Sequence, residues 1–121
     1  MIDTAITRRQ MANRFLREGR TAFRAQDADS AFAFLEDAHV LGQPYLRTHL
    51  TVHWWMLRVG LHQKDLQEVW GQLVRLMAAP IGHLTGRLPV GNTGRANVPV
   101  LRSMPIPSHL REIIDSPEEA E

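Results

Sequence analysis

The chain is 121 residues long, which is enough for one modest hydrophobic core and too short for two domains of ordinary size. Hydrophobic residues make up 44% and charged residues 22%, and the net charge of +1 lacks the basic excess that nucleic-acid binding requires. The absence of cysteine excludes disulfides, thiolate zinc sites and a cysteine nucleophile. A bound metal would therefore have to use histidine and carboxylate ligands.

The sequence shows no segment typical of a membrane or secreted protein. The N-terminal stretch MIDTAITRRQMANRF lacks the apolar run of a signal peptide, and no run of about 18 uncharged apolar residues follows it. We therefore expect a cytoplasmic protein that binds neither membranes nor nucleic acid. The sequence does not decide between a homodimer and a complex with another protein.

Apolar side chains recur at helical spacing in four successive segments. The first predicted helix covers residues 4–26, the second runs from Asp27 or Asp29 to Gly42, and the third and fourth cover about residues 45–62 and 66–79. Aspartate is a preferred N-cap residue, so Asp27 or Asp29 is expected to begin the second helix and Asp65 the fourth. Pro44 and Pro80 are expected to end these two helices, because proline cannot continue a regular helix.

A weak internal repeat relates the second predicted helix to the fourth. Residues 28–44 align with residues 64–80 at an offset of 36, which places Asp29 over Asp65 and Pro44 over Pro80. Tetratricopeptide helix pairs repeat at about 34 residues. We interpret the chain as an all-α fold of two antiparallel, tetratricopeptide-like hairpins. Two units are fewer than the three that usually form a stable stack, so another segment should cover the exposed apolar faces.

The segment after residue 82 is the candidate cover, because it is rich in glycine and proline yet carries many apolar residues. These include Leu88, Val90, Val98, Val100, Leu101, Met104 and Ile106. We expect an extended C-terminal arm packed along the helices, with a short helical turn after Ser108. The predicted organisation is one domain over residues 1–114 and a disordered acidic tail over residues 115–121.

One carboxylate and three histidines form two pairs on the second and third predicted helices. Glu36 and His39 are three residues apart, and His49 and His53 are four apart, so each pair shares one helix face. If the chain turns back near Pro44, His39 should face His49 and Glu36 should face His53. The sequence therefore predicts a site for one divalent transition metal formed by Glu36, His39, His49 and His53.

Imidazole and carboxylate ligands suit Fe, Zn, Mn, Ni or Cu, and the sequence does not choose among them. The prediction is a transition-metal-binding protein, either a metal-dependent enzyme or an accessory of metal resistance. No hydrolase or dehydrogenase motif assigns a reaction. The alternative is a tetratricopeptide-like interaction module without metal, in which the histidines pack in the core and Glu36 pairs with Arg47 or Arg58.

Other candidate groups have no helical spacing that ties them to these four residues. His62, His83 and His109 could complete the site only by folding back onto it. The stretch PVGNTGRAN contains Gly91, Asn92 and Gly94, which could form an anion-binding nest. Because the phosphate-loop pattern is absent, we favour a structural turn there.

The stretches LEDAHVLGQ, HLTVHWWMLRVG, EVWGQLVRL and GRLPVGNTGRANVPVLRSMPIPSHL resemble the bacterial domain-of-unknown-function family 3703 over roughly residues 10–114. The stretches PVGNTG and SMPIP are the most distinctive part of this resemblance. It implies no established activity. Genes of that family often lie near heavy-metal resistance functions, so the resemblance favours metal binding.

Overall fold

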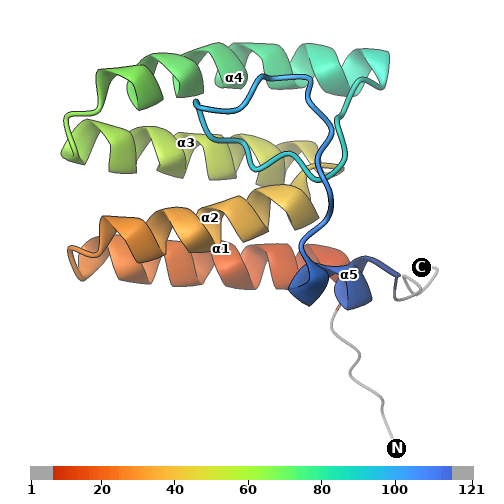
Figure 1. The fold of residues 1–121 in the computed structure, drawn as a ribbon, viewed down its shortest axis with the longest axis horizontal. Helices are drawn as coiled ribbons and strands as arrows, with labels where there is room; N and C mark the ends of the chain where they lie inside the picture. The colour runs from red at the N-terminus through yellow and green to blue at the C-terminus, as the bar shows by residue number, and fades with distance from the viewer. Residues whose placement is uncertain (1–6, 116–121) are drawn as a thin grey trace, which may run out of the picture.

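The computed structural model describes residues 7–115, and this part of the chain is all α-helical, with five helices and no strands (Figure 1). The helices are α1 (Arg8–Arg24), α2 (Ala28–Gly42), α3 (Leu46–His62), α4 (Leu66–Thr85) and α5 (Ser108–Asp115). α1 packs on α2, α3 packs on α4, and α2 joins the two pairs by packing on α3. None of these helices is both long and apolar enough to cross a membrane.

Local capping explains where the helices begin. Thr7 and Gln10 form a capping box at the start of α1. Asp27 begins α2 by accepting a hydrogen bond from the Ser30 amide, so Asp27 and not Asp29 is the cap. Asp65 begins α4 by accepting from the Glu68 amide, as predicted.

The structural repeat is longer than the offset that the sequence suggested. α3 begins 38 residues after α1, and α4 begins 38 residues after α2 (46 against 8, and 66 against 28). The residues before the two aspartate caps, Gln26 and Lys64, both adopt positive φ angles, of 64° and 56°. The predicted offset of 36 aligned Asp29 with Asp65 and Pro44 with Pro80, and neither pair is equivalent in the fold, where Asp27 is the cap that corresponds to Asp65.

The prediction that Pro80 ends the fourth helix was wrong. α4 continues to Thr85 and ends at Gly86, which has a φ of 75° and donates its amide to the Gly82 carbonyl. A proline inside a helix removes one backbone hydrogen bond, which a helix can survive when the following turn is held by other contacts. Here His83 in that turn contacts His49 of α3.

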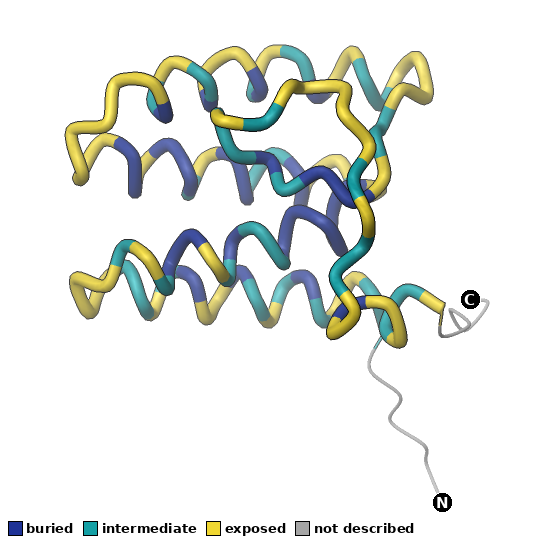
Figure 2. Tube along the Cα trace, in the orientation of Figure 1, coloured by how far each residue is buried: buried dark blue, intermediate teal, exposed yellow. Residues whose placement is uncertain are grey.

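The core lies between α1, α2 and α3, where buried positions concentrate in Figure 2. Its buried members are Leu16, Ala31, Phe32, Leu35, Ala38, Val52, Met56 and Val59. A second cluster of Ala12, Val40, Leu41 and Leu110 attaches α5 to α1 and α2. α2 and α3 are therefore the central helices, and α1 and α4 are the outer ones.

Residues 87–107 run across α3 and α4 and then down to α5 (Figure 1). Arg75 of α4 donates to the Val98 carbonyl in this arm. Asn92 holds the arm to itself, since its amide donates to the carbonyls of Pro99 and Arg102. The predicted acidic tail lies outside the described residues except for Asp115, which is the last residue of α5.

Candidate metal centre

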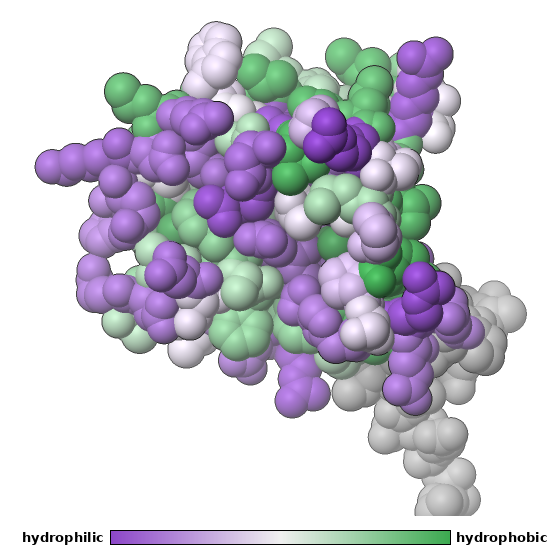
Figure 3. All heavy atoms as spheres, viewed as in Figure 1, coloured by the Kyte–Doolittle hydropathy of each residue, from purple (hydrophilic) through white to green (hydrophobic). Residues whose placement is uncertain are grey.

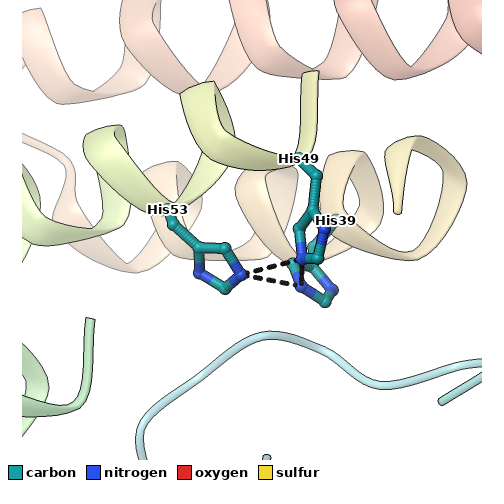
Figure 4. A group of neighbouring side chains, drawn as sticks. All are labelled: His39, His49 and His53. Carbon is teal, nitrogen blue, oxygen red and sulfur yellow. Dashed lines mark hydrogen bonds between the residues drawn. The ribbon is translucent and has the colours of Figure 1, made fainter. Parts of the chain in front are cut away.

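Three histidines meet between α2 and α3 (Figure 4). His39 lies in the last turn of α2, and His49 and His53 lie one turn apart on α3. The Nε2 atom of His39 is 3.1 Å from Nε2 of His49 and 3.1 Å from Nε2 of His53, and the latter two atoms are 3.0 Å apart. All three side chains are buried, with at most 4% of each residue exposed. Three imidazoles thus point one nitrogen each at a common centre.

The second ring nitrogen of each histidine, Nδ1, lies within hydrogen-bond distance of a group outside the three-histidine cluster, its outer partner. Nδ1 of His39 is 2.7 Å from the Asn92 carbonyl, and Nδ1 of His53 is 2.7 Å from Oε1 of Gln72. Nδ1 of His49 is 3.0 Å from Nε2 of His83. Because a carbonyl oxygen only accepts, His39 carries its proton on Nδ1.

The orientation of Gln72 assigns the proton of His53 in the same way. The amide nitrogen of Gln72 donates to Oε2 of Glu68 and to the Gly94 carbonyl, which leaves Oε1 to accept from His53. In His39 and His53 the proton therefore lies on the outer nitrogen, and each Nε2 presents a lone pair to the centre. Lone pairs 3.1 Å apart repel one another unless a cation lies between them.

The spacing of the three Nε2 atoms suits a metal ion. Ligand nitrogens on a tetrahedral zinc, each about 2.0–2.1 Å from the metal, lie about 3.3 Å apart. The observed separations of 3.0–3.1 Å are close to this value. Among the described residues, these three histidines form a buried group whose ligand atoms all lie within 4.8 Å of one another and that could hold a metal ion.

Burial and mutual proximity keep the three rings neutral at physiological pH. Burial lowers the pKa of His39 well below its ordinary value, and the neighbouring His53 and His49 lower it further. Burial also lowers the pKa of His49 to about 3 and that of His53 to about 4. A neutral imidazole is the form that binds metals, so no protons need to leave these rings at neutral pH.

A glycine-rich turn closes over His39. A Cβ atom at Gly94 would lie 2.5 Å from Cδ2 of His39, and the φ of 82° at this residue also favours glycine. Oδ1 of Asn92 accepts from the Gly94 amide, which fixes the turn that presents the Asn92 carbonyl to His39. The turn that we favoured as structural therefore also positions a candidate ligand.

The structure separates Glu36 from the three histidines. The Glu36 carboxylate accepts from Arg95 at 3.2 Å, and Arg95 also pairs with Glu68 at 2.9 Å. Glu36 is three residues from His39 and so points about 60° away from it around the helix. That rotation turns Glu36 toward the arm, and His39 alone reaches both His49 and His53. Neither Arg47 nor Arg58, the partners considered from the sequence, forms this ion pair.

The remaining histidines divide between the site and the surface. His83 contacts Nδ1 of His49, in the same way that Asn92 and Gln72 contact Nδ1 of the other two histidines. His62 contacts Gln26, and His109 contacts Asp37 at 3.0 Å, both at exposed positions. Sequence reasoning missed Gln72 as a site residue, because a glutamine on an outer helix carries no pattern that points to a histidine.

Comparison with curated proteins and with solved structures gives no match. A family model does match, under the description "Protein of unknown function (DUF3703)", and it spans residues 7–114. That range contains all three central histidines and all their outer partners. The chain therefore belongs to this family, as the motifs of its sequence indicated.

Proposed function

We propose that this protein binds one divalent transition metal through Nε2 of His39, His49 and His53. The observation that carries the proposal is the convergence of three Nε2 atoms whose rings are anchored from behind by other groups. Outer partners of this kind fix the tautomer and orientation of metal-binding histidines. A core histidine that only packs has no need of two identical neighbours at 3.1 Å.

The donor set favours metals that accept neutral nitrogen ligands. Zn, Fe, Mn, Ni and Cu all bind imidazole, whereas Ca and Mg prefer oxygen. We leave Glu36 out of the proposed ligand set, because its carboxylate is held by Arg95. Three protein ligands match the number that catalytic zinc sites use, which is compatible with an enzyme as well as with a metal-resistance accessory.

Metal analysis of protein made without a histidine tag tests the proposal. We expect about one metal ion per chain in the wild type and almost none in the His39→Ala, His49→Ala double variant, because one imidazole cannot hold the ion alone. The matched control is His62→Ala, His109→Ala, which removes two exposed histidines and should keep the metal. Equal metal content in all three proteins would overturn the proposal.

A second candidate function, protein docking, is favoured by the outer face of α4. Apolar residues spaced three or four apart are exposed along the whole helix. Figure 3 shows hydrophobic side chains at the top of the molecule, where α4 lies in Figure 1. They are Leu66, Trp70, Leu73, Met77, Ile81 and Leu84. The two residues of α4 with full charges, Glu68 and Arg75, are both buried. We call this uncharged surface the α4 stripe.

We propose a second copy of this chain as the occupant of the α4 stripe. In a symmetric dimer a charged side chain near the axis would lie close to its own copy and repel it, and the exposed residues of α4 include no charged side chain. Alternation of three- and four-residue steps is also the spacing by which paired helices interlock. The tetratricopeptide-like arrangement of two hairpins would then continue across the dimer, which would cover a face that two repeats leave open.

Light scattering coupled to size-exclusion chromatography measures this association. We expect a dimer for the wild type and a monomer for Trp70→Lys, Met77→Lys, since two charges would lie in the apolar interface. Trp54→Lys on α3 is the control, because Trp54 is also half-exposed but lies outside the α4 stripe. A wild-type monomer at all concentrations would contradict the proposed dimer.

A further inference from the structure

A cavity of about 520 Å³ adjoins the three histidines. It lies between the second half of α4 and the arm, and His39, His49 and His53 form part of its lining. Its apolar walls are formed by Ala78, Ala79, Ile81, Leu88, Val100 and Leu101. Cavities of about 300–1,000 Å³ with mostly apolar walls are typical of small-molecule sites. The volume is far larger than a metal ion needs.

The charged groups of the cavity are all positive. Arg75 and Arg87 line it, and no aspartate or glutamate does among the described residues. Arg75 is buried, and its guanidinium donates to the carbonyls of Gly71 and Val98. None of the ion pairs seen in the described part of the chain involves Arg75. Burial lowers the pKa of Arg75 and the nearby Glu68 carboxylate raises it, but Glu68 does not line the cavity, so the charged side chains that line it are positive.

The three rings leave room for one more ligand on the metal. Three histidines fill three positions of a tetrahedral ion, and the fourth is then free for water or another molecule. All three rings line the cavity, so a molecule bound there would lie next to an ion that they hold. The neutral rings add no negative charge, so a divalent ion there would keep its full charge of +2 and attract an anion.

We propose, on the basis of the metal site proposed above, that the cavity binds an organic carboxylate with an apolar chain. The carboxylate oxygen occupies the fourth position on the metal, and the chain lies along the apolar walls. Arg87, at the exposed rim, contributes positive charge that attracts the ligand. A short, fully polar anion would fill the metal position and leave the apolar walls unused.

Visible spectroscopy of the Co²⁺-loaded protein tests this inference, because ligand exchange at tetrahedral cobalt changes its absorption bands. Octanoate, acetate and 1-octanol serve as probes. We expect octanoate to shift the bands and to bind about a hundredfold more tightly than acetate, since its longer chain buries more methylene groups. 1-Octanol has the same chain without the charge and should leave the bands unchanged.

Variants of the cavity distinguish binding there from binding to the α4 stripe. Ala78→Phe places a ring in the cavity and should abolish the octanoate shift while Co²⁺ still binds in a 1:1 ratio. Arg87→Gln should weaken octanoate by about threefold, as expected for a charge at an exposed rim. Arg102→Gln, an exposed arginine outside the cavity lining, should change nothing.

The possible results separate this inference from the metal site itself. If Co²⁺ binds 1:1 and octanoate leaves the spectrum unchanged, the carboxylate ligand is overturned and the metal site stands. An octanoate shift that persists unaltered in Ala78→Phe would also overturn it. If Co²⁺ does not bind to the wild type, the metal site and the inference that rests on it both fail.

Discussion

Helix α4 buries a different kind of side chain from helices α1 and α2. In α1 and α2 the buried residues are mostly apolar, as in Leu16 and Leu35, and no aspartate, glutamate or arginine of these two helices is fully buried. In α4 the buried residues include Glu68, Gln72 and Arg75, and the large apolar residues are exposed. A helix with its polar face inward is not arranged for maximal core packing. The comparison teaches that α1 and the core face of α2 stabilise the fold, whereas the inner face of α4 supports a polar interior site.

The inward polar face of α4 connects the histidines to the arm. Gln72 accepts from His53 and donates to both Glu68 and the Gly94 carbonyl. Glu68 in turn accepts from Arg95 and from the Ala96 amide. Each of these groups is buried or half-buried, where a polar side chain is costly unless it is hydrogen-bonded. The polar interior is therefore a connected network that fixes one wall of the site.

Acidification is expected to have the largest effect, because it acts on the polar interior through all three buried histidines, His39 of α2 and His49 and His53 of α3. The pKa is about 3 for His49 and about 4 for His53 in the folded chain, against 6.5 when unfolded. Below pH 6.5 the unfolded chain binds more protons than the folded one, so the stability of the metal-free protein should fall as pH falls toward 4. Chemical denaturation at several pH values measures this loss.

The pH effect has a direct control. His62→Ala, His109→Ala should retain the full pH dependence, because these exposed histidines lie outside the buried cluster. His39→Ala, His49→Ala should lose most of it. A pH profile that is the same in the two double variants would show that the buried cluster does not control the acid response.

Substitution of a main-core residue should reduce stability and leave the three histidine ligands in place. Leu35→Ala removes a side chain that is 1% exposed in the main core, and we expect the free energy of unfolding to fall by about 2–5 kcal/mol. Metal content per folded chain should stay at the wild-type value. Loss of metal from the folded variant would contradict the division of roles between the apolar core and the polar interior site.

Two glycine-to-alanine variants test the support of the site with a smaller expected effect. Gly94→Ala and Gly86→Ala strain the backbone alike, at φ angles of 82° and 75°. A Cβ at Gly94 would strike the His39 ring, whereas one at Gly86 would meet nothing within 4 Å. We expect Gly86→Ala to lose about 1 kcal/mol of stability through backbone strain, and Gly94→Ala to lose more because the His39 ring must also shift. Only Gly94→Ala should weaken metal binding, by about 10–100-fold.

Isothermal titration calorimetry with the metal ion measures the metal affinity of the two glycine variants. Equal affinities would mean that the position of the His39 ring tolerates displacement and that the turn has no role in holding it.

Helical periodicity was sufficient to predict much of the fold and part of the site. The spacing of His49 and His53, together with the turn near Pro44, predicted that His39 and His49 face each other, which their 3.1 Å contact confirms. The same reasoning misplaced Glu36, because equal distance from a turn fixes the height along two helices and not the rotation around each. The sequence therefore predicts which turns of a hairpin lie opposite each other. Which side chains of those turns meet depends on the rotation of each helix about its axis.

Contacts from more distant segments could not be predicted by periodicity. Gln72 and His83 reach the site from α4 and Asn92 reaches it from the arm, and no short-range pattern fixes how those segments dock. Pro80 was expected to end α4, although the turn beyond it brings His83 to His49. The support of the site therefore depends on tertiary packing, whereas its three central residues follow from two helices and one turn.

Anomalous diffraction from crystals of the metal-loaded protein tests the central claim most directly. The account predicts one anomalous peak per chain, lying about 2.0–2.1 Å from Nε2 of each of His39, His49 and His53 if the ion is zinc. A fully loaded crystal with no peak at this position, or with its peak at other residues, would contradict the account.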